Sequence, residues 1–477
     1  MSNENNIQAT SLSTLEGVQT VYFIGIGGIG MSAIARYFHS KGFIVSGYDK
    51  TRTALTTQLE SEGIDIHYSE DLDAIPQHAD LVVYTPAVPK EHIELLYFQN
   101  NSYKVVKRSD VLQAITFDSF NICVAGTHGK TTVSTMIAHI LRHTGYGCNA
   151  FLGGISTNYE SNFWSSENDT CVIEADEYDR SFLKLSPDMA VITSMDADHL
   201  DIYGNEDSMQ DAFIAFGNKI KKGGILFSKF GLKRIKEIDV TKKLAYSLQN
   251  EAADVFASNI KIKEGGYQFD VHLPGSVLSN IDLQVGGMHN VENVVAAISV
   301  ANQLEIEPEK IRQAVAAYKG VKRRFEYVLA PKAKQEGAYV QPVLIDDYAH
   351  HPEELRPLLN SVRTLFPQRV LTVVFQPHLF SRTKDFADGF AEVLSVADNI
   401  ILLPIYPARE LPVKGVTSEL ILNKIKTKNK KVLSKEELLT WMSGHELNKE
   451  FGEVIVMAGA GDIDAMVQPV KKIIEKA

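Results

Sequence analysis

Short apolar runs alternate along the chain with segments in which apolar residues recur every three or four positions. The short runs predict buried strands, and the spaced segments predict amphipathic helices. One such helix is expected from about Glu353 to Phe366, with a buried face formed by Leu355, Leu358, Leu359, Val362 and Phe366. Because strands that alternate with helices are typical of parallel sheets, the pattern predicts an α/β fold.

Three of the expected strands run into a glycine-rich turn, at Val21 to Gly30, Asn121 to Gly129 and Val454 to Gly461. Nucleotide-binding α/β domains commonly begin with such a strand, turn and helix. With 477 residues, the chain also exceeds what one hydrophobic core usually organises. We therefore predict a Rossmann-like first domain, a central P-loop ATPase-like domain and a Rossmann-like third domain. The expected boundaries are residues 1–107, 108–324 and 325–477.

Charge and composition argue against a nucleic-acid-binding, secreted or membrane-spanning protein. The formal net charge of -11 argues against nucleic-acid binding, which usually needs a basic surface. Residues Met1 to Gln19 lack the apolar core of a secretion signal, and no apolar run approaches the roughly 20 residues that span a bilayer. The three cysteines, Cys123, Cys148 and Cys171, form no C-x-x-C pair. We expect a cytoplasmic protein that does not insert into membranes.

The first glycine-rich turn, Gly25-Ile26-Gly27-Gly28-Ile29-Gly30, matches the G-x-G-x-x-G fingerprint, and Asp49 ends the next strand about 20 residues later. The glycines let backbone N–H groups approach a diphosphate at a helix N-terminus. That chemistry suits NAD, FAD or a UDP-sugar, so this turn alone leaves a dehydrogenase open. A tight turn without any ligand is the structural alternative.

The second turn, Gly126-Thr127-His128-Gly129-Lys130-Thr131-Thr132, has the Gly-Lys-Thr core of a phosphate-binding loop. Lys130 can neutralise the β- and γ-phosphates of ATP, and Thr131 can hold Mg²⁺. The match is partial, because Val124 stands where the general motif has its first glycine. An apolar strand before the loop and a helical pattern after it still favour ATP and Mg²⁺ as ligands.

Acidic residues follow two further strands, at Glu174 to Asp179 and at Asp196 to Asp201. The carboxyl ends of parallel strands are where α/β sites form, and Mg²⁺ prefers oxygen ligands. We expect these carboxylates to complete a magnesium site, with a solvated acidic turn as the alternative. The spacing does not decide whether His199 is a ligand or a structural histidine.

The third block contributes Asp346 to Pro352 after one strand, and His378 with Arg382 after another. Histidines and an arginine at strand ends can orient a carboxylate and assist proton transfer from an amine. Zinc is the rival interpretation, but neither a cysteine nor a suitable histidine spacing supports it. We therefore expect substrate handling here.

Taken together, these motifs resemble the Mur ligase family over nearly the whole chain. The motifs that carry the resemblance are Gly126 to Thr132, Glu174 to Asp179, Asp198-His199, His289-Asn290 with Asn293, Arg323-Arg324, Asp346 to Pro352 and Ala458 to Ile463. The resemblance implies an ATP-dependent ligase of peptidoglycan precursor synthesis. It also implies that the first glycine turn holds the UDP part of UDP-N-acetylmuramate, which demotes the dehydrogenase hypothesis.

The resemblance further implies roles for individual residues. The UDP-substrate residues would be Gly25, Gly27, Gly28, Gly30, Asp49 and Arg108. The ATP residues would be Gly126, Thr127, His128, Gly129, Lys130, Thr131, Thr132, His289, Asn290, Asn293 and Arg324. Magnesium would be held by Thr131, Glu174 and His199, and the amino acid by Tyr348, His350 and Arg382. The catalytic residues would be Lys130, Glu174, His199, His350 and Arg382.

Within the family, Asp198 to Tyr203 and Ser181 to Pro187 fit the members that join L-alanine to UDP-N-acetylmuramate through an acyl phosphate. A relative that reattaches a recycled tripeptide shares the Glu-Tyr-Asp at Glu177 to Asp179 and stays the alternative. A P-loop binding protein without ligase activity is a third hypothesis. One departure matters, because Leu379 stands where the family commonly has an arginine. We expect a monomer or a homodimer.

Overall fold

The computed structural model describes residues 15–178, 180–196, 200–332, 340–408 and 410–476. The chain forms two compact units. Unit 1 comprises Met1–Ile155, Tyr159–Phe256 and Asn293–Ala314, and unit 2 comprises Ser156–Asn158, Ala257–Glu292 and Val315–Ala477. Each unit contains parallel β-sheet with helices, so the predicted α/β class is confirmed. The boundaries at residues 107 and 324 stay a prediction.

The first part of unit 1 is a five-stranded parallel sheet with the order β3-β2-β1-β4-β5. This order, with β1 at the point where the direction of winding reverses, is that of a Rossmann-like half. The strands are β1 (Thr20–Ile24), β2 (Ile44–Tyr48), β3 (Asp65–His67), β4 (Leu81–Tyr84) and β5 (Val105–Lys107). The helices are α1 (Ile29–Ser40), α2 (Ala54–Ser61), α3 (Ile93–Asn100) and α4 (Arg108–Thr116).

The second part of unit 1 contains a larger sheet in the order β13-β12-β11-β10-β6-β9-β7-β8, of which β13 runs on into unit 2. Its strands are β6 (Phe120–Ala125), β7 (Asn149–Ser156), β8 (Ser161–Trp164), β9 (Thr170–Glu174), β10 (Met189–Ile192), β11 (Ile225–Lys229), β12 (Lys242–Ser247) and β13 (Val255–Lys263). The helical segments are α5 (Lys130–His143), η1 (Ser181–Lys184), α6 (Leu200–Tyr203), α7 (Glu206–Gly217) and η2 (Ile235–Glu237). Helices α8 (Met288–Gln303) and α9 (Pro308–Ala317) lie mostly in unit 1, but the first residues of α8 and the last residues of α9 belong to unit 2.

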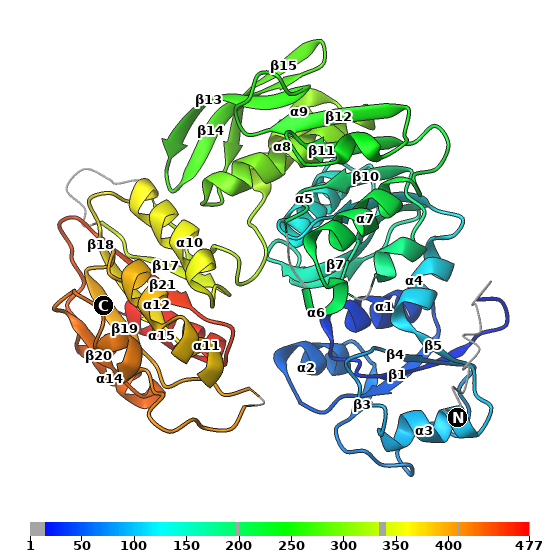
Figure 1. The fold of residues 1–477 in the computed structure, drawn as a ribbon, viewed down its shortest axis with the longest axis horizontal. Helices are drawn as coiled ribbons and strands as arrows, with labels where there is room; N and C mark the ends of the chain where they lie inside the picture. Colours follow the sequence, from blue (N-terminus) through cyan, green and yellow to red (C-terminus); the bar gives the residue numbers. More distant parts are fainter. Residues whose placement is uncertain (1–14, 179, 197–199, 333–339, 409, 477) are drawn as a thin grey trace. The chain divides into compact units, whose positions relative to one another are not determined.

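Helix α1 lies between the two parts of unit 1, as Figure 1 shows. The fully buried Asn162 of β8 donates to the Ser32 hydroxyl at 3.0 Å and to the Ile29 carbonyl, and its oxygen accepts from Arg36. A buried amide that satisfies both its donor and its acceptor fixes one relative orientation. The first glycine turn is thereby held against the central sheet.

Unit 2 contains the antiparallel hairpin of β14 (Gly266–Leu273) and β15 (Ser276–Leu283), and a six-stranded sheet with the order β16-β17-β21-β18-β19-β20. The strands are β16 (Glu326–Leu329), β17 (Val343–Asp347), β18 (Val370–Phe375), β19 (Asn399–Leu402), β20 (Lys430–Val432) and β21 (Glu453–Ala458). The helices are α10 (Pro352–Leu365), α11 (Phe380–Asp385), α12 (Ala387–Leu394), α13 (Glu419–Leu422), α14 (Lys435–Gly444) and α15 (Asp464–Ile474).

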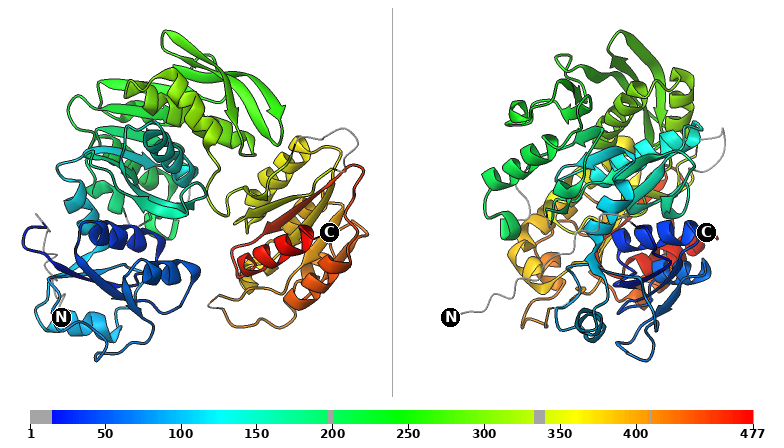
Figure 2. Two further views of the ribbon diagram at one scale, coloured as in Figure 1. Left: turned by 180° about the vertical axis from the view of Figure 1, so that it is seen from behind. Right: turned by 90° about the vertical axis from the view of Figure 1, so that its right-hand side faces the viewer.

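Both faces of this six-stranded sheet are covered. Helices α10 and α12 lie on the face seen in Figure 1, and α15 lies on the face seen from behind in Figure 2. This double cover explains why most residues of the central strands β17, β18 and β21 are apolar and buried. The helix predicted from about Glu353 to Phe366 is α10, with Leu355, Leu358, Leu359 and Val362 buried as expected.

Three other expectations concern the cysteines, membrane-spanning helices and the third glycine-rich turn. All three cysteines are buried free thiols, as predicted. Among the helices that the structure describes, none combines the length and the apolarity needed to cross a bilayer. The segment from Val454 to Gly461 does consist of a strand, β21, followed by a glycine-rich turn. However, β21 is an inner strand of the six-stranded sheet and not the first strand of a domain.

Candidate functional site

The phosphate loop predicted at Gly126 to Thr132 connects β6 to α5, and its two glycines have backbone angles that other residues rarely adopt. Gly126 has φ +136° and Gly129 has φ +83°. A Cβ atom on Gly126 would overlap the Thr193 hydroxyl and lie 2.8 Å from the Ser194 amide nitrogen. The loop therefore passes too close to the end of β10 for any side chain at position 126.

We expect Gly126→Ala to lower the free energy of unfolding by about 1–3 kcal/mol and to remove ATP binding, because strain and overlap displace the loop. Urea unfolding and calorimetric ATP titration measure the two effects. The matched control is Gly145→Ala, since Gly145 has φ +79° but open space around it. Equal losses in the two variants would show that the close approach at Gly126 has no consequence.

The loop is braced by the residues that follow β10. The Ser194 hydroxyl accepts from the His128 amide at 2.7 Å and lies 2.8 Å from the Thr127 hydroxyl, while Thr193 donates to the His128 carbonyl. The Asp196 amide donates to the Thr127 hydroxyl at 3.2 Å. Thr127 and His128 thus shape the loop through bonds within the protein.

Lys130 lies at the first position of α5, where the helix N-terminus favours an anion. Its ammonium donates to the Gly126 carbonyl at 2.7 Å and to the Glu177 carboxylate at 2.8 Å. Glu177 is fully buried, and burial raises the pKa of its carboxyl although the Lys130 charge opposes this. These two bonds fix the lysine beside the loop, as phosphate binding requires.

Thr131 and Glu174 meet as the sequence predicted. The Thr131 hydroxyl donates to one oxygen of Glu174 at 2.9 Å, and the Gly153 amide donates to the other oxygen at 2.9 Å. A hydroxyl and a carboxylate side by side are oxygen donors that suit Mg²⁺. The third predicted ligand, His199, lies outside the described residues. Within the part of the chain that is described, no three His, Cys, Asp or Glu side chains form a metal site.

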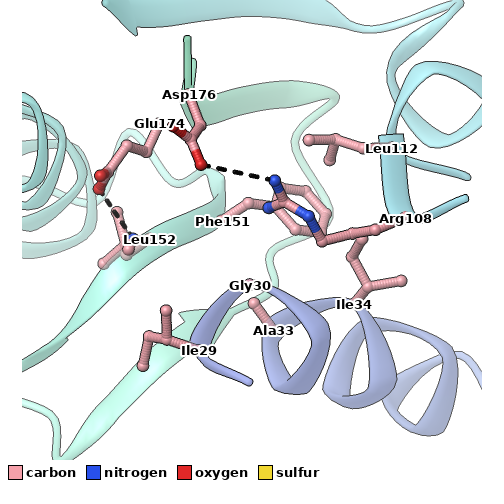
Figure 3. Close-up of a pocket in the computed structure, with 11 residues that line it drawn as sticks. Ile29, Gly30, Ala33, Ile34, Arg108, Leu112, Phe151, Leu152, Glu174 and Asp176 are labelled. Atoms are coloured by element: carbon pink, nitrogen blue, oxygen red, sulfur yellow. Dashed lines mark hydrogen bonds and ion pairs between the residues drawn. The ribbon is translucent and has the colours of Figure 1, made fainter. Parts of the chain in front are cut away.

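A cavity of about 110 Å³ connects this region to the first part of unit 1 (Figure 3). It is lined by Gly30 of α1, Arg108 of α4, Glu174 at the end of β9 and Asp176 just after that strand. Arg108 lies 3.8 Å from Asp176, and a Cβ atom on Gly30 would overlap the Arg108 guanidinium. The structure therefore brings a cation and the Glu174 carboxylate together around one small space.

The amides of the first glycine turn make hydrogen bonds within the protein. The amides of Gly25 and Ile26 both donate to the Tyr48 carbonyl, at 2.8 and 3.0 Å. The Gly27 amide donates to Asp49 at 2.8 Å, and the Gly28 amide donates to the Gly25 carbonyl at 3.2 Å. In this structure Asp49 braces the turn, and these four amides bond within the protein.

The residues predicted around the adenine nucleotide are divided between the units. Asn293, in unit 1, lies against the phosphate loop, where a Cβ atom on Gly129 would be 3.1 Å from its oxygen. His289 and Asn290 are in unit 2 with Arg324. Asn290 is buried and donates to the Gly286 carbonyl at 2.7 Å. Burial and the Arg324 charge lower the pKa of His289, which favours its neutral form.

A second cavity, of about 310 Å³, lies within unit 2. It is lined by His289, by residues 323–325, by residues 347–349 and by Glu354, Pro357 and Leu358 of α10. Asp347 accepts from the amides of Phe325 and Ala349 at 2.7 and 2.8 Å, while burial raises the pKa of its carboxyl to about 6. Asp347 belongs to the predicted motif from Asp346 to Pro352, and no separate role was expected for it.

The neighbouring Asp346 is buried 3.7 Å from Arg323. Its Oδ1 atom has no hydrogen-bond partner among the residues that the structure describes. Burial outweighs the attraction of Arg323 and raises the pKa of this carboxyl to about 7. The folded protein therefore holds a proton here that the unfolded chain releases above about pH 4.

We expect this proton to make stability depend on pH. The free energy of unfolding of the wild type should fall, relative to Asp346→Asn, as the pH rises from about 4 to about 7, by roughly 1–4 kcal/mol. Urea unfolding at pH 5 and pH 8 measures the difference. Asp388→Asn, at an exposed position of α12, is the control. A difference between wild type and Asp346→Asn that does not change with pH would contradict this prediction.

Two of the residues predicted for the amino acid, Tyr348 and His350, belong to an aromatic row in unit 2 that continues with His378 and Tyr406. The ring of His350 lies edge-on to Tyr348 at 5.2 Å and to His378 at 5.7 Å between centroids, and His378 stacks on Tyr406 at 5.7 Å. Arg382 lies 3.3 Å from the Nδ1 atom of His378. The structure thus brings Tyr348, His350 and Arg382 to one place, as expected.

Leu379, at the position of the family's arginine, is half-buried with φ +70°. Its amide donates to the Tyr406 carbonyl at 2.9 Å, and its carbonyl accepts from the Thr383 amide at 3.1 Å. A positive φ at a leucine costs free energy, so these bonds hold a strained turn before α11. Leu379 shapes the turn between His378 and Arg382 and supplies no charge.

Sequence reasoning missed three residues that the structure places beside these sites. Glu177 contacts Lys130, Ser194 braces the phosphate loop, and Glu354 lies 3.2 Å from Nδ1 of His350. Glu177 was visible only as one member of an acidic run. Ser194 and Glu354 lacked any signal, since a single serine or a glutamate in a helix is common.

Comparisons with known proteins agree with this arrangement of an α/β fold around a phosphate loop. Residues 20–118 match the Mur ligase family catalytic domain, residues 124–301 the Mur ligase middle domain, and residues 323–461 the Mur ligase glutamate ligase domain. The chain belongs to the Mur ligase family, whose members are ATP-dependent. The predicted resemblance and the three-domain architecture are confirmed.

Several curated relatives share one enzyme name. The chain is 49% identical over 465 residues to a UDP-N-acetylmuramate–L-alanine ligase of Porphyromonas gingivalis, covering 96% of this chain and 99% of the relative. It is 45% identical to the enzyme of that name from Flavobacterium johnsoniae, covering 97% and 99%. A solved UDP-N-acetylmuramate-alanine ligase of Thermotoga maritima matches with a TM-score of 0.78 and 26% identity, over 96% of this chain and 98% of that one.

A solved murein peptide ligase of Psychrobacter arcticus also matches, with a TM-score of 0.65 at 22% identity over 96% of this chain and 99% of that one. At this level of identity the similarity concerns the fold alone. The Mur ligase relatives leave no support for the dehydrogenase hypothesis or for a binding protein without ligase activity.

Proposed function

We propose that this protein joins L-alanine to the carboxylate of UDP-N-acetylmuramate in peptidoglycan precursor synthesis, with ATP converted to ADP and phosphate. The curated relatives of that name, at 44 to 49% identity over nearly the full chain, support the substrates. The structural observation that carries the proposal is the cavity of unit 1. It is lined by Arg108, Gly30 and Glu174, and an oxygen of Glu174 accepts from Thr131 of the phosphate loop.

In the proposed first step, an oxygen of the muramate carboxylate attacks the γ-phosphorus of ATP, and ADP leaves with the bond electrons. Lys130 would bind the β- and γ-phosphates, while Thr131 and Glu174 would hold Mg²⁺ together with His199. Bound Mg²⁺ would supply neutralisation of phosphate charge. Arg108 lies where it would orient the sugar's carboxylate or diphosphate, which explains its place beside Gly30.

In the proposed second step, the alanine amine attacks the acyl phosphate and phosphate leaves. Tyr348, His350 and Arg382 would handle the amino acid, with Arg382 as the cation for its carboxylate because Leu379 has none. His289, Asn290, Asn293 and Arg324 would lie near the adenine nucleotide. Gly25, Gly27, Gly28 and Asp49 would shape the UDP site, with the N-terminus of α1 facing the diphosphate.

ADP release in the presence of UDP-N-acetylmuramate tests the function, with L-alanine, glycine, L-serine and the tripeptide compared as acceptors. Turnover with L-alanine and little with the tripeptide is the expected result. Oxygen-18 placed in the muramate carboxylate should appear in the released phosphate, since the acyl phosphate transfers one carboxylate oxygen. Preference for the tripeptide would assign the recycling reaction, and label that stays out of phosphate would reject the acyl phosphate.

A further inference from the structure

The hydrogen bonds of His350 determine which of its ring nitrogens carries the proton. Its Nδ1 lies 3.0 Å from the carbonyl oxygen of Tyr348 and 3.2 Å from an oxygen of Glu354. A carbonyl oxygen only accepts, so Nδ1 must donate. The neutral ring therefore has its hydrogen on Nδ1 and a lone pair on Nε2, for which the described residues offer no hydrogen-bond partner. This is the arrangement of a general base.

Glu354 is fixed in place although its side chain is 49% exposed. The same oxygen accepts from the backbone amides of His350 at 2.8 Å and His351 at 3.1 Å, as part of the capping box that begins α10. Since the cap holds the carboxylate beside Nδ1, Glu354 orients the ring and stabilises the positive charge that follows protonation. This is how a carboxylate assists the histidine of a hydrolase triad.

The other histidine of the row has the opposite arrangement. The Arg382 guanidinium lies 3.3 Å from Nδ1 of His378. Because a guanidinium can only donate, Nδ1 of His378 accepts, and the neutral ring of His378 has its hydrogen on Nε2. Protonation of Nδ1 would break this bond and place two positive charges together. His378 is thus suited to hold Arg382 and not to take up a proton.

The surroundings of His350 favour a neutral ring ready to accept a proton. Burial lowers the pKa of its imidazole, and the charges of Arg382 and His351 act in the same direction. The Glu354 carboxylate and the Tyr348 carbonyl oppose this and raise the pKa. The uncharged ring of His378 completes the surroundings. Of the groups that raise the pKa of His350, Glu354 therefore contributes most.

We propose that His350 and Glu354 form a dyad that accepts the proton of the attacking amine, with His350 as the catalytic residue and Glu354 as its positioning residue. The inference rests on the proposed function. The amine nitrogen forms a bond to the acyl carbon, the carbon–oxygen bond to phosphate breaks, and phosphate leaves with that electron pair. The proton of the amine goes to Nε2 of His350 and later to solvent.

The experiment compares two nucleophiles in wild type, His350→Gln and Glu354→Gln. With L-alanine, we expect turnover to fall about 100-fold in His350→Gln and about tenfold in Glu354→Gln. Hydroxylamine is largely unprotonated at neutral pH and needs no base, so hydroxamate formation from the acyl phosphate should stay close to the wild-type rate. Retained hydroxamate formation also shows that each variant is folded. Glu353→Gln, on the same exposed turn, is the matched control.

The dependence of L-alanine turnover on pH separates the proposed role of Glu354 from a structural role, which would leave this dependence unchanged. Without the Glu354 charge the pKa of His350 falls, so the acidic limb of L-alanine turnover should shift to lower pH in Glu354→Gln. An unshifted limb, or equal losses with L-alanine and hydroxylamine, would overturn the dyad. Failure of the proposed function is distinguishable, because the wild type would then release no ADP in response to UDP-N-acetylmuramate and L-alanine.

Discussion

Lys130→Ala is expected to lower ligase turnover about 1,000-fold while leaving the binding of UDP-N-acetylmuramate unchanged. The ammonium lies beside the phosphate loop, held by the Gly126 carbonyl and by Glu177. Removing it takes away the charge that would stabilise the transferring phosphoryl group. The UDP site that we propose lies in the first part of unit 1 and should not be affected by the change. ADP release and calorimetric titration of the UDP-sugar measure the two quantities.

This variant also leaves the buried Glu177 without its lysine, which by itself can cost about 3–5 kcal/mol of stability. The double variant Lys130→Ala with Glu177→Gln removes that charge and separates catalysis from folding. Lys242→Ala, at an exposed position of β12, is the control. Turnover near the wild-type level in the double variant would reject the role of Lys130.

Glu174→Gln is expected to lower turnover about 100-fold and to raise the Mg²⁺ concentration needed for half-maximal rate. Glutamine keeps the size of the side chain and can still bond Thr131, but it removes the negative charge that would attract the cation. Initial rates over a range of Mg²⁺ concentrations measure the effect. Glu167→Gln, exposed in the same part of unit 1, is the control. An unchanged Mg²⁺ dependence would exclude Glu174 from the metal site.

Much of the fold was accessible from the sequence because its signals are local. The apolar runs at Leu81 to Tyr84 and Leu371 to Phe375 lie in β4 and β18, since buried parallel strands need apolar residues on both faces. The antiparallel hairpin of β14 and β15 was not predicted. Its strands expose one face and carry polar residues such as Gln268 and Asp282, which interrupt the apolar signal.

The site was predictable in part, for the same reason. Glycines and Lys130 stand together in the chain, so the phosphate loop is visible without a structure. A magnesium site that includes Thr131 and Glu174 was expected from oxygen ligands after apolar strands and from the family resemblance, and the structure adds that their strands, β6 and β9, are neighbours. The role of Asp49 did not follow, because the fingerprint gives its position but not the hydrogen bond to Gly27.

The sequence by itself determined the fold class, the phosphate loop and, by resemblance, the family. These depend on residue types and on spacings within single segments. Only the tertiary structure decided that Glu177 holds Lys130, that Arg108 meets Glu174 across a cavity, and which histidine of the aromatic row can accept a proton. The physical reason is that a hydrogen bond depends on the distance and direction between two atoms, and the fold sets these between residues far apart in the chain.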